Sequence, residues 1–170
     1  RVVTEEAVSR KLSFLPEISG VPFEIFTEGT ENRKEPADLA VAVDVSDMNR
    51  LGSRTVLFET AKRKIRIDHH AAGRDFAPVT VCNPLWAATA EGIYAFLTEC
   101  GVIWEKNAQN AGWIESAATC LYTALVTDTG CFAYSNVTGD TFRIAAALRA
   151  VTGDLSWVYR KTFETKTRAA

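Results

Sequence analysis

The chain has 170 residues, of which 47% are hydrophobic and 24% are charged, and its formal net charge is −2. This composition is that of an ordinary globular domain with one sizeable core. The small negative charge excludes a chain that binds nucleic acid through a general basic surface, so a nucleic-acid substrate would need a local basic groove or another domain. No signal peptide and no membrane-spanning apolar run are found, which predicts a cytoplasmic protein without membrane contact.

The four cysteines support the same compartment. Cys82, Cys100, Cys120 and Cys131 fall within apolar segments, and no two of them form a C-x-x-C pair. We expect reduced core residues rather than disulfides or zinc ligands.

The first 36 residues are predicted to form short elements. Thr4 followed by Glu5 and Glu6 is a helix-start signal, and that helix would end near Leu15. The other expectations here are the end of a strand at residues 2–3, a strand at 23–26 and a polar loop at 28–36.

The rest of the chain alternates between strands and helices. Residues 39–43 are continuously apolar, the pattern of a strand buried on both faces in a parallel sheet. Further strands are expected at 64–67 and 79–82, helices at 55–62, 86–100, 110–126, 138–151 and 154–163, and a short extended segment at 132–134. This order predicts an α/β domain with a mostly parallel sheet flanked by helices.

Acidic residues and histidines stand at the ends of these predicted elements. Asp44 follows the strand at 39–43, Asp68, His69 and His70 follow the next strand, and Asp128 follows the long second helix. Because the carboxyl ends of parallel strands lie along one edge of a sheet, we expect Asp44, His69 and Asp128 to converge there.

Such a cluster has the composition of a metal site. Carboxylates that converge without a cation repel one another and raise each other's pKa. Imidazole together with carboxylate suits Mn²⁺, Zn²⁺ or Fe²⁺ better than Ca²⁺, and two such ions can clamp a phosphoryl group and generate hydroxide. Asp44 and Asp128 are natural bridging ligands and His69 a terminal ligand, while His70 or Asp68 could fix the orientation of a ring.

Each residue also has a purely structural interpretation. Asp44 alone could cap the turn that follows it, and Asp128 alone could be a turn residue before Gly130. We interpret Asp47 as a cap or surface group, and Arg66 as part of a solvated surface rather than a phosphate clamp. The spacing alone favours a metal site without excluding these alternatives.

Three stretches together resemble a known family. Ala-Val-Ala-Val-Asp44-Val-Ser-Asp, Ile-Asp-His-His at 67–70 and Leu-Val-Thr-Asp128-Thr-Gly resemble motifs two, three and four of the DHH phosphoesterases. The stretches at 83–91 and 132–138 are most similar to the branch of bifunctional oligoribonucleases that also dephosphorylate 3′-phosphoadenosine 5′-phosphate. The resemblance implies a Rossmann-like DHH domain, a parallel sheet flanked by helices.

The resemblance also implies roles for individual residues. Asp44 and Asp128 would bridge two Mn²⁺ ions, for which Mg²⁺ or Co²⁺ could substitute, and His69 would ligate one ion. His70 would face the scissile phosphate as a catalytic residue, and Asp68 would support the histidines. Substrate-binding residues stay unassigned.

The activity implied by the resemblance is that of a manganese-dependent phosphodiesterase. Such an enzyme hydrolyses short oligoribonucleotides to mononucleotides by two-metal activation of water, and acts as a phosphatase on 3′-phosphoadenosine 5′-phosphate. Short RNA or nucleotides would be its partners, and a homodimer stays open. The alternatives are a cyclic-dinucleotide phosphodiesterase, a manganese inorganic pyrophosphatase, and a non-catalytic DHH domain that binds nucleotide or serves a regulatory interface.

Two features of the family have no match in the chain. These are its first motif, a histidine followed by Asp-x-Asp on the first strand, and the Gly-rich stretch of its C-terminal DHHA1 domain. We therefore expect residues 1–170 to be a DHH domain truncated at its N-terminus, without the substrate-binding DHHA1 domain. This part alone is predicted to hold an incomplete metal site, to bind Mn²⁺ poorly and to be inactive.

Overall fold

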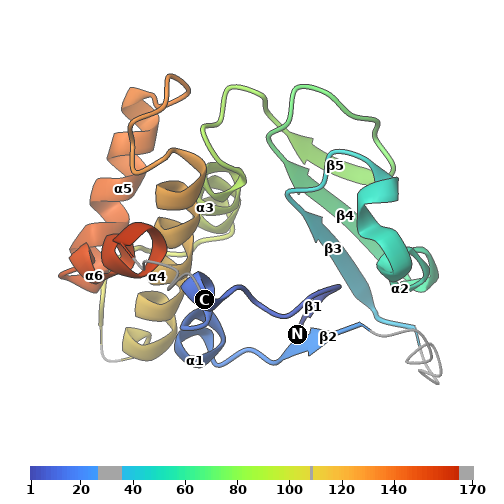
Figure 1. Ribbon diagram of the computed structural model, residues 1–170, viewed down its shortest axis with the longest axis horizontal. Helices are drawn as coiled ribbons and strands as arrows, with labels where there is room; N and C mark the ends of the chain where they lie inside the picture. Colours follow the sequence, from blue (N-terminus) through green and yellow to red (C-terminus); the bar gives the residue numbers. More distant parts are fainter. Residues whose placement is uncertain (27–35, 108, 165–170) are drawn as a thin grey trace, which may run out of the picture.

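The computed structural model describes residues 1–26, 36–107 and 109–164. Its strands form two parallel sheets, the pair β1-β2 and a three-stranded sheet in the order β3-β4-β5 (Figure 1). The predicted α/β class, with parallel strands flanked by helices, is confirmed. In chain order the elements are β1 (Val2–Thr4), η1 (Arg10–Leu12), α1 (Leu15–Ser19), β2 (Phe23–Ile25), β3 (Leu39–Val43), η2 (Met48–Arg54), α2 (Thr55–Thr60), β4 (Arg63–Asp68), β5 (Val79–Cys82), α3 (Thr89–Glu99), α4 (Ala111–Asp128), α5 (Gly139–Thr152), α6 (Ser156–Tyr159) and the π-helical turn η3 (Arg160–Glu164).

The edge strand β3 is covered on one face only. Ala42 packs with Phe58 of α2 in a small core, whereas Leu39, Val41 and Val43 are each 44% exposed. The prediction of a strand buried on both faces is therefore wrong. Side chains alternate across a strand, and among the described residues η2 and α2 cover only the face that carries Ala42.

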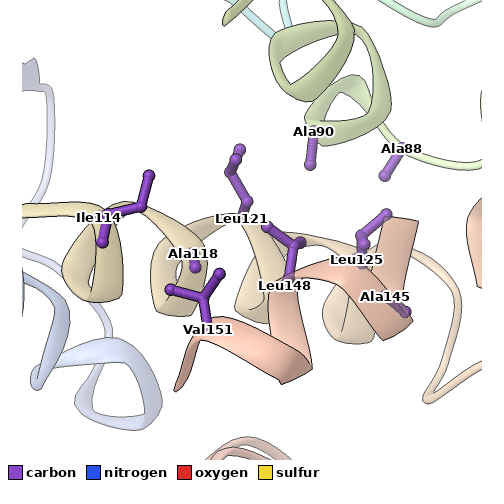
Figure 2. Packing of buried hydrophobic residues seen from close by; sticks show 9 residues of the cluster. All are labelled: Ala88, Ala90, Ile114, Ala118, Leu121, Leu125, Ala145, Leu148 and Val151. Atoms are coloured by element: carbon purple, nitrogen blue, oxygen red, sulfur yellow. The ribbon is translucent and has the colours of Figure 1, made fainter. Parts of the chain in front are cut away.

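The largest core lies among the helices. α4 contacts α3 and α5, and Ile114, Leu125 and Leu148 have no exposed surface (Figure 2). Burying one side chain of this size contributes about 1.5–3 kcal/mol. The same cluster includes Ala88 and Ala90 at the start of α3, so this end of α3 is fixed against α4. Since α3 also contacts β4, the helical layer is joined to the three-stranded sheet at that point.

The predicted helix starting at Thr4 is absent. The first α-helix, α1, begins at Leu15, where the predicted helix was to end, and Pro16 lies in its first turn. Proline is accepted there because the first amides of a helix have no intrahelical partner. The carboxylate of Glu5 instead accepts a hydrogen bond of 3.0 Å from the backbone amide of Ser53, which is 48 positions away in the sequence.

The strands predicted at 2–3 and 23–26 are confirmed as β1 and β2, and the loop predicted at 28–36 lies almost wholly outside the described residues.

The segment after α4 is a tight turn, so the extended conformation predicted at 132–134 is wrong. Thr129 stabilises this turn through three hydrogen bonds. Its hydroxyl accepts one from the backbone amide of Phe132, and its carbonyl oxygen accepts one each from the amides of Ala133 and Tyr134. Cys131 and Phe132 have φ of 58° and 63°, the left-handed values that such a turn requires. The turn leads directly to α5, whose first residues are capped by Thr138.

All four cysteines are free, as predicted. Cys82 and Cys100 are nevertheless exposed, which corrects their expected core position, because they lie at the last residue of β5 and just after α3. No helix in the described part of the chain is long and apolar enough to cross a membrane.

Candidate metal centre

Asp44 is positioned by a strained turn at the end of β3. Its φ of 60° is left-handed, which costs a residue with a side chain about 1–3 kcal/mol. The amide of Asp44 still donates to the carbonyl of Ile67 at 2.9 Å and so continues the pairing of β3 with β4. The hydroxyl of Thr89, the first residue of α3, donates to Oδ1 of Asp44 at 2.8 Å. The carboxylate is thus held between the end of β4 and the start of α3.

The two histidines follow β4 and lie against Asp44. Nδ1 of His69 is 3.1 Å from the carbonyl oxygen of Trp86, which can only accept, so Nδ1 carries the proton. Nε2 of His69 is left with its lone pair, 3.5 Å from Oδ1 of Asp44. Nδ1 of His70 is 2.7 Å from Oδ1 of Asp68, which fixes the same tautomer when Asp68 is ionised. The two imidazole rings pack edge to face, with their centroids 4.8 Å apart.

Asp68 itself is fully buried beneath the histidines. Burial raises the pKa of its carboxyl group, but hydrogen bonds from His70, from the backbone amide of His69 and from Arg66 outweigh burial, and the net pKa is lowered. Asp68 is therefore an ionised acceptor. Arg66 is only 2% exposed, so its predicted place on a solvated surface is wrong: its guanidinium donates to Asp68 in a buried pair.

Asp128 is the last residue of α4, and its side chain lies near the centre. Burial raises the pKa of its carboxyl group, and the charge of Asp44 raises it further, while His69 and His70 lower it. The carboxylate of Asp128 therefore lies within electrostatic reach of the other three side chains. Two carboxylates in mutual repulsion are a site at which a cation is favourable.

The structure brings Asp44, His69 and His70 together as a group that could hold a metal ion. Each offers a ligand atom, and these atoms lie within 4.8 Å of one another. Asp128 stands outside this tight group but near it, and Asp68 lies behind His70. The donor set of carboxylate and neutral imidazole fits a divalent first-row metal. The individual ligand roles predicted from the sequence stay predictions.

Three groups at the centre were not predicted as site groups from the sequence. They are the hydroxyl of Thr89, the carbonyl oxygen of Trp86 and the guanidinium of Arg66, which hold Asp44, His69 and Asp68 respectively. The sequence signals for them are that Trp86 and Thr89 lie in the 83–91 stretch that resembles the family, and that Arg66 stands two residues before Asp68 on the same strand.

The helices around the centre are tied together by a buried carboxylate. Glu91, in the first turn of α3, is 3% exposed and accepts a hydrogen bond from the hydroxyl of Thr141 in α5. In addition, the side-chain amide of Asn136 donates to the carbonyl of Ala87 at 2.9 Å. These bonds join the segment that follows Asp128 to the segment that carries Thr89.

Comparison with known proteins gives relatives but no matching family model. An uncharacterised protein of Mycoplasma pneumoniae is 33% identical over 110 residues, which are 65% of this chain and 30% of that protein. The bifunctional oligoribonuclease and PAP phosphatase NrnA of Thermus thermophilus is 32% identical over 113 residues, 66% of this chain and 31% of that protein. The chain spans less than a third of the length of these curated relatives.

Solved structures agree with the fold. The crystal structure of an exopolyphosphatase-related protein from Bacteroides fragilis matches 99% of this chain and 48% of its own, with a TM-score of 0.82 and 24% identity. A Methanococcus jannaschii protein assigned to the family II inorganic pyrophosphatases matches 95% of this chain and 50% of its own, with a TM-score of 0.63 and 19% identity. Over about two thirds of its residues the chain is thus homologous to a DHH-family phosphoesterase, which confirms the resemblance seen in its three motifs.

Proposed function

We propose that this chain is the metal-binding part of a manganese-dependent phosphodiesterase. Its substrates would be short oligoribonucleotides, hydrolysed to mononucleotides, and 3′-phosphoadenosine 5′-phosphate, from which it would remove the 3′-phosphate. The observation that carries the proposal is the group formed by Asp44, His69 and His70, with Asp128 beside it. The name of the Thermus thermophilus relative supports the choice of substrates.

The chemistry would use the two histidines differently. Nε2 of His69 has its lone pair free and would ligate the metal together with the carboxylates of Asp44 and Asp128. A divalent cation held there would polarise a phosphoryl oxygen and lower the pKa of water. His70 would face the scissile phosphate, where Nε2 could hold or give a proton while Nδ1 donates to Asp68.

The test is hydrolysis by the natural polypeptide that contains this sequence. With Mn²⁺ present it would be offered a short RNA, 3′-phosphoadenosine 5′-phosphate, cyclic di-AMP and inorganic pyrophosphate. We expect turnover of the first two, and we expect Asp44→Asn to lower it by at least about 100-fold. The matched control is Asp47→Asn, three positions on; within the described part of the chain its carboxylate accepts a hydrogen bond only from the amide of Asn49, which caps η2.

The alternatives predict other results. Turnover of cyclic di-AMP or pyrophosphate alone would move the proposal to one of those substrates. Binding of nucleotide with no hydrolysis of any of the four would favour a non-catalytic domain. Hydrolysis that is equally fast in Asp44→Asn and in Asp47→Asn would refute the assignment of the centre.

A further inference from the structure

The guanidinium of Arg66 occupies a site where several segments of the metal centre meet. Nε donates to the carbonyl of Val45 at 2.8 Å, Nη1 donates to Oδ1 of Asp75 at 2.9 Å, and Nη2 donates to Oδ2 of Asp68. The ring of Phe76 lies 5.6 Å from the guanidinium carbon, so a cation–π contact covers one side. Each nitrogen of the guanidinium therefore has its own partner.

We propose that Arg66 is a positioning residue of the metal centre, which sets the orientation of His70 through Asp68. The guanidinium holds Oδ2 of Asp68, and this leaves Oδ1 directed at Nδ1 of His70, 2.7 Å away. With both oxygens engaged, the plane of the carboxylate cannot rotate. The ring of His70 is thereby kept in the tautomer that carries its proton on Nδ1 and leaves Nε2 free.

The charges explain why an arginine suits this position. Asp68 has no exposed surface and Arg66 is 2% exposed, so neither charge is compensated by water. A buried carboxylate that has lost its hydration is strongly destabilised unless a cation is paired with it, so Asp68 needs a partner such as Arg66 to stay in place beneath His70. Because guanidinium stays charged and offers a planar fork of donors, it can serve Asp68 and two further acceptors at once.

The same side chain ties the surrounding loops to the centre. Val45 directly follows Asp44, so the bond to its carbonyl fixes the strained turn at the end of β3. Asp75 belongs to the segment between β4 and β5, and the amide of Arg74 in that segment donates to the carbonyl of Ser46 at 3.2 Å. Arg66 thus joins both loops to Asp68. The side chain of Asp75 is 73% exposed, so we expect the pair with Asp75 to matter least.

The proposal is tested by the tautomers of the two histidines. His69 and His70 are the only histidines among these 170 residues, so His69→Gln and His70→Gln identify their two ring systems in the natural polypeptide labelled with ¹⁵N in its imidazole rings. At alkaline pH and without metal, we expect both rings to carry their proton on Nδ1. His69 is an internal control, because its tautomer is held by Trp86 and not by Asp68.

Three variants separate the contributions of Arg66. Arg66→Gln removes the charge, and we expect His70 to become a mixture of tautomers while His69 keeps its signals. Arg66→Lys keeps the charge, but its single nitrogen cannot reach the three separate acceptors that Nε, Nη1 and Nη2 of Arg66 serve, so the fraction of His70 protonated on Nδ1 should fall by less. It also provides a folded sample if Arg66→Gln does not fold. Asp75→Asn removes only the exposed pair and should leave both rings unchanged.

The outcomes are unambiguous. Any folded variant at position 66 in which His70 keeps the parental signals overturns the proposal. An equal change at His69 and His70 would indicate general loosening of the centre, and it would overturn the proposal as well. The effect of Arg66 on hydrolysis rests on the function proposed above, whereas the tautomers are read without substrate or metal. A protein that hydrolyses none of the four substrates can therefore still show the predicted change at His70.

Discussion

The hydroxyl of Thr89 donates a 2.8 Å hydrogen bond to Oδ1 of Asp44, across 45 positions of the sequence. Thr89 is 3% exposed and begins α3, a helix whose start is fixed against α4 by Ala88 and Ala90. The position of the Asp44 carboxylate therefore depends on the packing of the helical layer as well as on the turn that ends β3.

This relationship predicts a loss of metal affinity in Thr89→Val. Valine keeps the shape of threonine but donates nothing, so the carboxylate of Asp44 can rotate away from its ligating orientation. We expect binding of Mn²⁺ to weaken by about 10–100-fold, the usual effect of losing a group that orients a metal ligand. Stability should fall by only about 1 kcal/mol. Calorimetric titration of the natural polypeptide with Mn²⁺ measures the affinity, and urea unfolding measures the stability. The control is Thr89→Ser, which keeps the hydroxyl, and equal affinities of the two variants would contradict the prediction.

A second prediction concerns the pH dependence of stability at Asp128. Burial, and then repulsion by Asp44, raises the pKa of its carboxyl group above the ordinary 3.8. The folded state therefore binds this proton more tightly than the unfolded state, and the resulting stabilisation is present below pH 3.8 and is lost as the pH rises through the folded pKa. Without metal, Asp128→Asn should therefore raise the unfolding midpoint at neutral pH, and the gain should shrink in acid.

Asp154 provides a control of opposite sign. The backbone amide and the hydroxyl of Ser156 donate to its carboxylate and lower its pKa. Its contribution is present above the ordinary pKa and is lost as the pH falls through the folded value. Asp154→Asn should therefore lower the midpoint slightly at neutral pH and have no effect in acid. Thermal unfolding followed by circular dichroism over a pH series distinguishes the two, and midpoint changes of the same sign would disprove the argument.

A third prediction compares two glycines with positive φ. A Cβ at Gly73 would lie 2.1 Å from the carbonyl oxygen of Ser46, whereas a Cβ at Gly101 would meet nothing within 4 Å. Both substitutions by alanine strain the backbone, but only Gly73→Ala also forces the 71–78 segment away from the loop after Asp44. We expect a loss of about 1–3 kcal/mol for Gly73→Ala and a smaller loss for Gly101→Ala. Urea unfolding provides both values, and equal losses would show that the close approach to Ser46 is unimportant.

A fourth prediction concerns the reactivity of the thiols. Cys82 and Cys100 are exposed, while Cys120 is half-buried and burial raises the pKa of its thiol. Since the thiolate is the reacting form, Cys120 should be modified more slowly than Cys82 and Cys100 in the native protein. All four cysteines should react once the protein is denatured without reductant. Mass spectrometry after timed alkylation gives the order, and fewer than four reactive thiols, with air oxidation excluded, would indicate a disulfide.

What the sequence predicted correctly depends on local pattern. The apolar run at 39–43 and the β-branched run before Asp68 predict β3 and β4, and the polar residues that follow them mark one edge of the sheet. The motifs alone also brought Asp44 and the two histidines into one hypothesis. The conformation of such runs is determined by a few neighbouring residues, so it can be predicted without tertiary information.

What the sequence could not predict depends on distant partners. The bond that buries Arg66 against Val45 spans 21 positions, and the contact that removes Glu5 from a helix start spans 48. Both residues are charged, and charge in a single sequence favours the surface. The exposure of Leu39, Val41 and Val43 also depends on distant segments, because it is decided by which elements cover the second face of β3.

The dispersal of the metal centre along the chain also has a kinetic consequence. Its side chains come from the ends of β3, β4 and α4, and they meet only after the parallel strands have paired and α3 has docked. Pairings between distant segments form slowly, because each must first close a long loop. A cation that binds only the assembled centre finds no site while the chain is still collapsing. Such a cation should therefore leave the folding rate unchanged and prolong the lifetime of the native state by slowing its unfolding.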